Sequence, residues 1–445
     1  MKVSIVGTGY VGLVTGVCLA EKSHSVLCVD VDSKKVDQIN AGIPPVHEKG
    51  LDELLLKNIG LRLLATTDLE KSVVDTDITV VAVGTPFNGG AIDLSHIKAV
   101  AREIGYALRS KNTYHVIVVK STVVPGTTDD VVRPLLEEAS RKQAGADFGV
   151  GMNPEFLTEG EAIQDFMHPD RIVVGGMDEK TRFVLESLYQ AFTGVPIVRT
   201  NNKTAEMIKY TSNALLATMI SFSNEIGNLC AALGGADVVD VLKGVQLSKY
   251  LSIAQPNGTR IKPDINSFLW AGCGFGGSCL PKDVKALVVH GANAGTPMKL
   301  LNAVIDINEH QHEQVLALLR KHFINLEGIR VAVLGLAFRP DTDDTRESPA
   351  IPIVQELLRR GAAVTVYDPV VKNRDGDLFH NRSVVNAVDL AQAISNVDAV
   401  VLVTRWQEFS KLPTLLSQLD QPPIFIDGRR MLDKRSVGRY EGIGL

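Results

Sequence analysis

A glycine-rich stretch from residue 274 to residue 283 carries the clearest candidate nucleophile, Cys279. Its sequence, Gly-Phe-Gly-Gly-Ser-Cys-Leu-Pro-Lys-Asp, predicts a turn that ends at a helix start, since Pro281 suits a first helical turn and Asp283 suits the positive end of the helix dipole. A thiol placed there, close to Lys282, should lose its proton more easily than a free cysteine. The glycines would let a bulky ligand approach the backbone. A cysteine taken at random is more often a buried packing residue, but these neighbours favour a reactive one.

The composition excludes several classes of function. The chain has 445 residues, which predicts two or three domains. A hydrophobic content of 45% with 22% charged residues is typical of a soluble globular protein with an ample core. The net charge of -5 gives no basic field for nucleic acid or an anionic membrane. The cysteines are odd in number and scattered, which indicates a reducing cytoplasm and no disulfide framework: Cys18, Cys28, Cys230, Cys273 and Cys279.

The N-terminal stretch has the pattern of a dinucleotide-binding unit. Residues 3–6 predict a strand, residues 7–12 read Gly-Thr-Gly-Tyr-Val-Gly, residues 13–22 predict a helix, and residues 25–30 predict a strand ending in Asp30. A pyrophosphate would rest on the amides of this turn and of the helix start. Asp30 would accept hydrogen bonds from the ribose hydroxyls, and its charge would disfavour NADP, so NAD is the expected cofactor. The pattern also argues against a signal peptide, and no targeting or membrane-spanning segment is expected.

Two further apolar runs end in polar residues. Residues 78–83 precede Gly-Thr85-Pro, and residues 116–119 precede Lys-Ser-Thr122. Ligands of parallel sheets gather beyond the carboxyl ends of the strands, where both threonines would lie. Each threonine alone is more often a cap or turn residue. The alternation of strands and helices predicts a doubly wound domain that extends to about residue 198.

An acidic loop follows another short strand pattern. Residues 153–160 read Asn-Pro-Glu-Phe-Leu-Thr-Glu-Gly. If Glu155 is partly buried beside Phe156 and Leu157, its pKa would be raised and it could act as a base. Two exposed loop acids, Glu155 and Glu159, are the ordinary alternative.

From residue 204 to about residue 234 the pattern is that of one long helix. Its apolar residues cover more than one face, which suits a helix that joins two domains and pairs with its copy in a second subunit. Lys209 and Asn213 are one turn apart and share a face. Helical lysines are usually solvated, so a role for Lys209 depends on the fold bringing it to Cys279.

The C-terminal part opens a second βαβ unit. Residues 330–335 predict a strand, residues 348–360 a helix and residues 363–369 a strand, and two more strands are predicted at 399–404 and 423–427. The turn after the first strand lacks the dinucleotide glycine pattern, which indicates that this domain binds a nucleotide by other means. The candidate phosphate ligands are Arg339 and Arg429, although each arginine taken singly would more often be solvated.

Several of these motifs, in this order, resemble the UDP-glucose/GDP-mannose dehydrogenase family over nearly the whole chain. They are Gly-Thr-Gly-Tyr-Val-Gly at 7–12, Asn-Pro-Glu-Phe-Leu at 153–157, Lys209 with Asn213, Gly-Phe-Gly-Gly-Ser-Cys at 274–279, Asp-Thr-Arg-Glu-Ser at 344–348 and Asp-Gly-Arg-Arg at 427–430. The resemblance implies an α/β fold with an N-terminal Rossmann NAD domain (1–200), a long central helix in a dimerisation region that carries the cysteine (201–300), and a C-terminal Rossmann-like domain for a UDP-sugar (301–445). It also implies a homodimer through the central helix.

The resemblance further assigns roles to residues. Cys279 would be the nucleophile, Lys209 and Asn213 would stabilise oxyanions, Asp283 would assist the water step, Glu155 would be a base, and Thr122 would position water. The expected NAD contacts are Gly7, Gly9, Tyr10, Val11, Gly12, Asp30, Lys35, Thr85, Thr122, Glu159 and Arg346. The expected sugar-nucleotide contacts are Glu155, Phe156, Leu157, Lys209, Asn213, Arg260, Phe268, Phe275, Gly276, Phe338, Arg339 and Arg429. No metal is expected.

The implied reaction is a four-electron oxidation at C6 of a nucleotide sugar, with UDP-glucose as the first candidate and UDP-glucuronate as its product. The segment 260–268 lacks the glycine that the family usually has after Arg-Ile and is longer, and Trp270 stands where relatives that use UDP-glucose often carry Lys or Asn. These departures leave dTDP-glucose or GDP-mannose open as substrates. Two other hypotheses are a two-electron hydroxyacid dehydrogenase that uses Lys209 as its acid and base, and a non-catalytic NAD and nucleotide-sugar sensor with Cys279 as its redox group.

Overall fold

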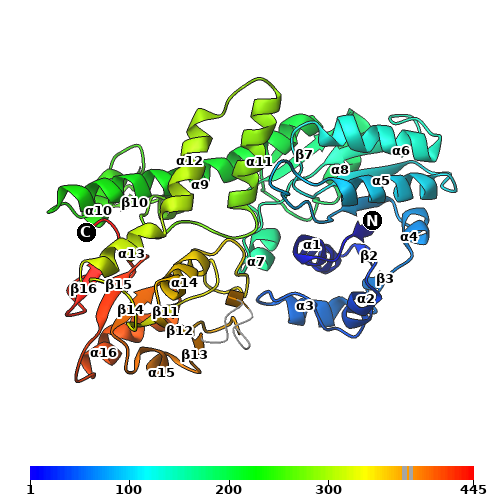
Figure 1. Cartoon of the computed structure of the whole chain (residues 1–445). Coiled ribbons are helices and arrows are strands. Elements are labelled where there is room, and N and C mark those ends of the chain that lie inside the picture. The colour runs from blue at the N-terminus through cyan, green and yellow to red at the C-terminus, as the bar shows by residue number, and fades with distance from the viewer. Residues whose placement is uncertain (373–377, 380–383) are drawn as a thin grey trace. The chain divides into compact units, whose positions relative to one another are not determined.

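The computed structural model describes residues 1–372, 378–379 and 384–445. The chain divides into two compact units, Met1–Ser212 (unit 1) and Asn213–Leu445 (unit 2). Each has its own sheet and its own hydrophobic core (Figure 1). No helix among the described residues is long and apolar enough to cross a membrane.

The sheet of unit 1 has the strand order β3-β2-β1-β4-β5-β6-β7-β8. Its strands pair in parallel except for β6 with β7, which are antiparallel. The strand order changes direction between the neighbouring strands β1 and β4. Ligands of doubly wound sheets bind at this point, beyond the carboxyl ends of the strands. The strands are β1 (Lys2–Val6), β2 (Ser25–Val29), β3 (Leu63–Thr66), β4 (Ile78–Val81), β5 (His115–Val119), β6 (Phe148–Met152), β7 (Ile172–Gly176) and β8 (Ile197–Thr200).

Helices cover both faces of this sheet, as expected for strands that are buried on two sides. The helices α1 and α3 share one hydrophobic core with the sheet, and α5 and α6 share another with its opposite face (Figure 1). The predicted doubly wound N-terminal domain is therefore confirmed. The helices are α1 (Tyr10–Glu21), α2 (Ser33–Asn40), α3 (Leu51–Asn58), α4 (Leu69–Asp75), α5 (Ser95–Leu108), the π-helix η1 (Thr128–Val132), α6 (Arg133–Ser140), α7 (Ala162–Met167) and α8 (Glu179–Ser187).

The predicted long helix is α9 (Asn202–Leu233), which has 32 residues. It begins in unit 1 and continues into unit 2, whose boundary falls after Ser212. The next elements are α10 (Val238–Gln246), the short antiparallel pair β9 (Ile253–Ala254) and β10 (Arg260–Ile261), and the 3-10 helix η2 (Asp264–Phe268).

Unit 2 contains a parallel sheet with the strand order β13-β12-β11-β14-β15-β16. This arrangement confirms the predicted second βαβ unit. The strands are β11 (Arg330–Leu334), β12 (Ala363–Tyr367), β13 (Val385–Asn386), β14 (Ala399–Leu402), β15 (Ile424–Asp427) and β16 (Tyr440–Gly442). The helices are α11 (Leu280–Asn293), α12 (Lys299–His310), α13 (Glu313–Arg320), α14 (Ala350–Arg359), α15 (Leu390–Ile394), the 3-10 helix η4 (Gln407–Lys411) and α16 (Leu412–Ser417).

Candidate active site

The glycine-rich turn of unit 1 leads directly into α1. A Cβ atom on Gly12 would lie 1.8 Å from the carbonyl oxygen of Gly7, and one on Gly7 would lie 2.8 Å from that of Ala82. Gly7 also has a φ of +95°, a conformation that side chains rarely allow. Beside Gly9 a Cβ would meet no atom within 4 Å, so the outer side of the turn is open. The helix begins at Tyr10, earlier than the predicted residue 13, which places the amides of residues 10–12 at its N-terminus, where a pyrophosphate would bind. The turn therefore fits NAD.

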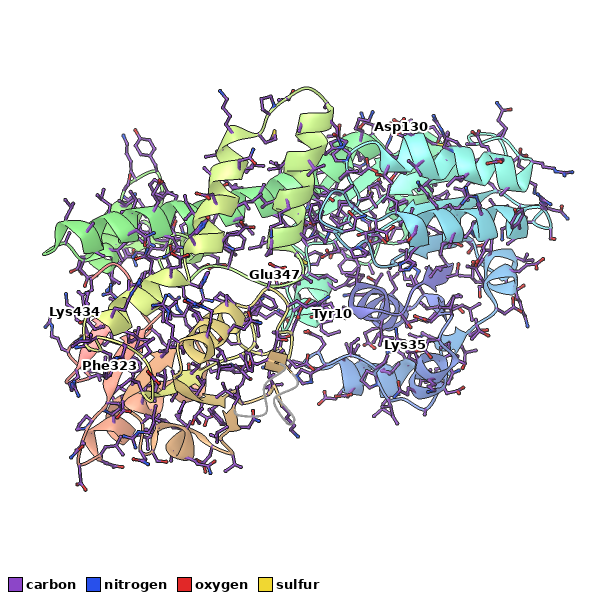
Figure 2. The ribbon with its side chains drawn as sticks, viewed as in Figure 1. Tyr10, Lys35, Asp130, Phe323, Glu347 and Lys434 are labelled. Atoms are coloured by element: carbon purple, nitrogen blue, oxygen red, sulfur yellow. The ribbon has the colours of Figure 1, made fainter. Side chains whose placement is uncertain are left out.

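Asp30 is held in place at the end of β2. Its carboxylate accepts hydrogen bonds from Thr8 N (2.8 Å), Thr8 Oγ1 (2.6 Å) and Asp32 N (3.0 Å). Partial burial opposes its ionisation, but these bonds and the charge of Lys35 on α2 hold its pKa below the ordinary value (Figure 2). Asp30 is therefore an ionised, fixed acceptor, which suits a ribose and disfavours the extra phosphate of NADP.

The two predicted threonines lie on neighbouring loops. Thr85 follows β4 and donates its hydroxyl hydrogen to the carbonyl oxygen of Thr122, which follows β5, at 2.7 Å. Ser121 binds back to the carbonyl oxygen of Val83 at 2.7 Å. The structure thus brings both threonines together at the carboxyl end of the sheet.

Glu155 and Lys209 form a buried ion pair in unit 1. Their side chains are 5% and 4% exposed, and Lys209 Nζ lies 2.9 Å from Glu155 Oε1. The other carboxylate oxygen accepts a hydrogen bond from Leu157 N at 2.7 Å, and the ammonium lies 5.5 Å from the centroid of the Phe156 ring. Burial favours a neutral Glu155, but the charge of Lys209 outweighs it and holds the pKa of Glu155 below the ordinary value. The predicted raised pKa of Glu155 is therefore wrong, because its partner lies far away in the sequence.

Sequence reasoning missed a second buried lysine, Lys120, which follows β5 and is 4% exposed. Its ammonium donates to Asn153 Oδ1 at 2.9 Å, and this bond joins the loop of Thr122 to the loop of Glu155. Burial, together with the charge of Lys209, lowers the pKa of Lys120 to about 8, although Glu155 acts in the opposite direction. The signal that could have found it is its place in Lys-Ser-Thr, directly after a buried strand.

In unit 2, Cys279 is the residue that precedes α11, as predicted. It is partly exposed, whereas the other four cysteines are buried, and none of these five described cysteines forms a disulfide. Its sulfur lies 3.5 Å from the hydroxyl oxygen of Ser278. A cysteine at a helix N-terminus is stabilised as the thiolate by the helix dipole.

The glycines before Cys279 are required by neighbouring protein atoms. A Cβ on Gly276 would lie 2.3 Å from the carbonyl oxygen of Glu347, and one on Gly277 would lie 2.7 Å from the ring of Phe338. The amide of Gly277 donates to the carbonyl oxygen of Arg346 at 2.8 Å, beside Glu347 (Figure 2). The sequence suggested that glycines are needed here so that a ligand can approach. The structure shows that they are needed because Glu347 and Phe338 pack too closely to leave room for a Cβ.

Asp283 connects α11 to α9 within unit 2. Its side chain is 1% exposed and accepts hydrogen bonds from Asn213 Nδ2 and from Lys282 Nζ, both at 2.6 Å. Its own amide donates to the carbonyl oxygen of Cys279 at 2.9 Å, so the two residues are one helical turn apart. The predicted group of Cys279, Asp283 and Asn213 is therefore contiguous.

The residues of unit 2 that were predicted to bind the sugar nucleotide or NAD make different contacts from one another. Arg429 donates to the carbonyl oxygens of Val403 (2.5 Å) and Gly274 (2.6 Å), so it braces the turn of Cys279. Arg260 lies on β10 and binds the hydroxyl and carbonyl oxygens of Ser252 within its own hairpin. Of the others, Arg346 pairs with Asp344 and is largely exposed, Phe275 is bound through its backbone to Asn308, and Phe268 and Arg339 are half-buried.

Comparison with known proteins identifies relatives over the full chain. Family models match residues 1–193, 203–310 and 332–434, and they describe the NAD-binding, central and UDP-binding domains of the UDP-glucose/GDP-mannose dehydrogenase family. A UDP-glucose 6-dehydrogenase of Haloferax volcanii is 41% identical, with 100% of both chains covered. A GDP-mannose 6-dehydrogenase of Pseudomonas syringae pv. tomato is 40% identical, also with 100% of both covered. The solved UDP-glucose dehydrogenase of Pyrobaculum islandicum has a TM-score of 0.89 at 37% identity and covers 100% of this chain and 97% of that one.

Proposed function

Because this chain belongs to the UDP-glucose/GDP-mannose dehydrogenase family, with NAD as its cofactor, we propose that it oxidises the C6 alcohol of UDP-glucose to the carboxylate of UDP-glucuronate. The observation that carries the proposal is the arrangement of unit 2, where a partly exposed cysteine precedes α11 and lies one turn from an Asp283 that holds Asn213. UDP-glucose is preferred because relatives with that activity match the chain over its full length, although one acting on GDP-mannose is nearly as similar.

The chemistry needs a nucleophile that both adds and leaves, and Cys279 meets both requirements. NAD, when bound at the glycine-rich turn and Asp30, would supply the hydride acceptor, and two NAD molecules in succession would be needed, one for the alcohol and one for the thiohemiacetal. Between these events the thiolate adds to the C6 aldehyde and forms a thiohemiacetal, whose oxidation gives a thioester. Water then adds to the thioester carbonyl, the thiolate leaves, and the carboxylate is released. For each sugar, two NAD and one water are consumed, and two NADH and three protons are released with the carboxylate.

The polar residues have separate tasks in this sequence. The Lys209 ammonium and the Asn213 amide, one turn apart on α9, would stabilise the oxyanions of the two tetrahedral species. Loss of one such contact typically costs about 3–4 kcal/mol of transition-state stabilisation. Glu155 would accept a proton and Thr122 would hold water. Asp283 would orient Asn213 and assist the water step with Lys209.

We also propose a homodimer through α9. In unit 2 this helix exposes Leu215 (51%), Phe222 (48%) and Leu229 (53%), which are spaced by seven residues and lie on one stripe. Apolar residues spaced by seven are typical of a helix that packs against another helix. A second copy of α9 presents the same stripe, so the two copies can pack against each other.

The test is the number of NADH molecules formed for each UDP-glucose consumed, measured by absorbance together with quantification of the sugar. The proposal expects two, a two-electron dehydrogenase gives one, and a binding protein gives none. Parallel reactions with dTDP-glucose and GDP-mannose test the nucleotide. In Cys279→Ser the acid should not be released, and steady formation of UDP-glucuronate at the wild-type rate would refute the role of the sulfur.

A further inference from the structure

Glu48 is a buried carboxylate that joins three separate segments of unit 1. It lies between α2 and α3 and is 3% exposed. Its oxygens accept hydrogen bonds from Gly160 N at 2.8 Å and Ala162 N at 2.9 Å, and from the hydroxyl of Tyr10. The tyrosine hydroxyl also accepts from Gly160 N, at 3.2 Å. One side chain therefore holds the start of α1 and the end of the loop that carries Glu155.

The groups around this carboxylate are neutral donors. Within the part of the chain that the structure describes, no lysine, arginine or histidine forms an ion pair with Glu48. Buried carboxylates are costly unless they are fully hydrogen-bonded, so the amides and the hydroxyl are needed to keep it there. Burial and the adjacent Glu48 raise the pKa of Tyr10 well above its ordinary value, which keeps the proton on the tyrosine. The direction of this bond is thereby fixed, with Tyr10 as the donor and Glu48 as the acceptor.

The donors belong to the two places where ligands are expected. Tyr10 is the first residue of α1 and lies in the turn that fits the pyrophosphate of NAD (Figure 2). Gly160, with a φ of +90°, closes the loop from Glu155, and Ala162 begins α7. Tyr10, Gly160 and Ala162 all donate to the Glu48 carboxylate. If the side chain of Tyr10 becomes less mobile, the carboxylate that accepts from Gly160 and Ala162 becomes less mobile too.

We propose that Glu48 is a positioning residue that couples NAD binding at the glycine-rich turn to the conformation of the loop Glu155–Gly160. Binding of NAD at the start of α1 restrains Tyr10, and the restrained hydroxyl holds Glu48 against the amides of Gly160 and Ala162. The loop that presents Glu155 is then held more firmly in the NAD complex than in the chain without NAD. This inference needs only the cofactor and does not depend on which sugar nucleotide is oxidised.

Hydrogen exchange measured by mass spectrometry on the full chain, with and without saturating NAD, tests the coupling. In the wild type, NAD should slow exchange of the peptides covering residues 156–167 by about tenfold or more, as expected when amide bonds to a charged acceptor are stabilised. Glu48→Gln keeps the shape but places an NH2 group against the amides. In that variant NAD should still bind, as measured by NADH fluorescence, and the slowing should fall below about twofold.

A matched control is Glu21→Gln, which changes another carboxylate of unit 1, one that accepts from Lys57 and Asn58 on α3. It should retain the full NAD effect. If Glu48→Gln does not fold, Tyr10→Phe removes only the hydroxyl and should reduce the NAD effect at equal saturation. Equal slowing in wild type and in the variants, or no slowing in wild type with NAD bound, would overturn the coupling. Both results can be read even if the chain oxidises no sugar nucleotide.

Discussion

The lowered pKa of the buried Lys120 predicts that the stability of unit 1 changes with pH in an unusual way. The ordinary pKa of 10.5 is lowered to about 8 in the folded chain, mainly by burial. Between these two values the unfolded chain holds a proton that the folded chain has lost, so unfolding takes up a proton. The free energy of unfolding must then rise with pH across this window. A difference of about 2.5 pH units, at about 1.4 kcal/mol for each, gives an increase of about 3–4 kcal/mol.

The perturbation is Lys120→Met, which keeps an unbranched side chain of similar length and removes the titrating group. The assay is urea unfolding of the full chain from pH 7.5 to pH 10.5, followed by far-UV circular dichroism with a reductant present. The transition of unit 1 is identified as the one that NAD shifts to higher urea, because a ligand stabilises the unit that binds it. The free energy of unfolding of the wild type should rise by about 3–4 kcal/mol more than that of the variant over this pH range.

The matched control is Lys57→Met, since Lys57 belongs to the same unit and its side chain is 63% exposed. This control should keep the wild-type pH dependence. If Lys120→Met and wild type show the same change of stability between pH 8 and pH 10.5, then burial does not lower the pKa of this lysine. The conclusion that Lys120 loses its proton near pH 8 in the folded chain would then be wrong.

Three more predictions address the candidate site, and a fourth addresses the dimer through α9. Lys209→Met leaves Glu155 buried without its partner and should destabilise unit 1 by about 3–5 kcal/mol, measured by urea unfolding; adding Glu155→Gln should restore part of this, and a double variant that loses the sum of both single effects would contradict the pairing. Gly277→Ala should lower kcat at least about tenfold, because the strained turn must shift, while the Kd for NADH is unchanged; equal kcat would be contrary evidence. Asp283→Asn should reduce kcat by about a hundredfold with little effect on KM, measured by steady-state kinetics, and wild-type turnover would exclude its role. Phe222→Asp should convert a dimer to monomers in analytical ultracentrifugation, and an unchanged mass would argue against pairing through α9.

The sequence predicts those parts of the fold that depend on local patterns. Strand periodicity, the glycine turn before α1 and the helix start after Cys279 each involve neighbouring residues, and the structure places them as expected except that α1 begins three residues early, at Tyr10. The pKa of Glu155 could not be predicted, because its ion pair with Lys209 joins segments far apart in the chain. Local reasoning therefore gave the wrong direction for the shift of the Glu155 pKa, while its role as a base stays a prediction.

The same limit applies to the residues that support the cysteine turn. The pattern Gly-Gly-Ser-Cys indicates a special turn, but it does not reveal that Glu347 and Phe338 lie against the glycines. Arg429 was predicted as a phosphate ligand because a guanidinium in a nucleotide-binding domain suits that task. Its guanidinium also binds the carbonyl oxygen of Gly274, a contact between segments about 155 residues apart that no local pattern predicts. Residue type and position in a motif therefore do not reveal which contacts a side chain makes with distant segments of the fold.

The contact between Asn213 and Asp283 also explains why an amide and a carboxylate are needed together. An ionised carboxylate can only accept hydrogen bonds, so it selects the NH2 group of Asn213, which donates at 2.6 Å. One N–H is thereby fixed on Asp283, and in the proposed reaction the second N–H of the same amide would be the donor to an oxyanion. A lysine in place of Asn213 would bring a second strongly hydrated charge, whereas a leucine would leave Asp283 with Lys282 as its remaining partner. The pair thus supplies a donor whose direction is set before any substrate binds, which is the condition under which a hydrogen bond lowers a barrier most.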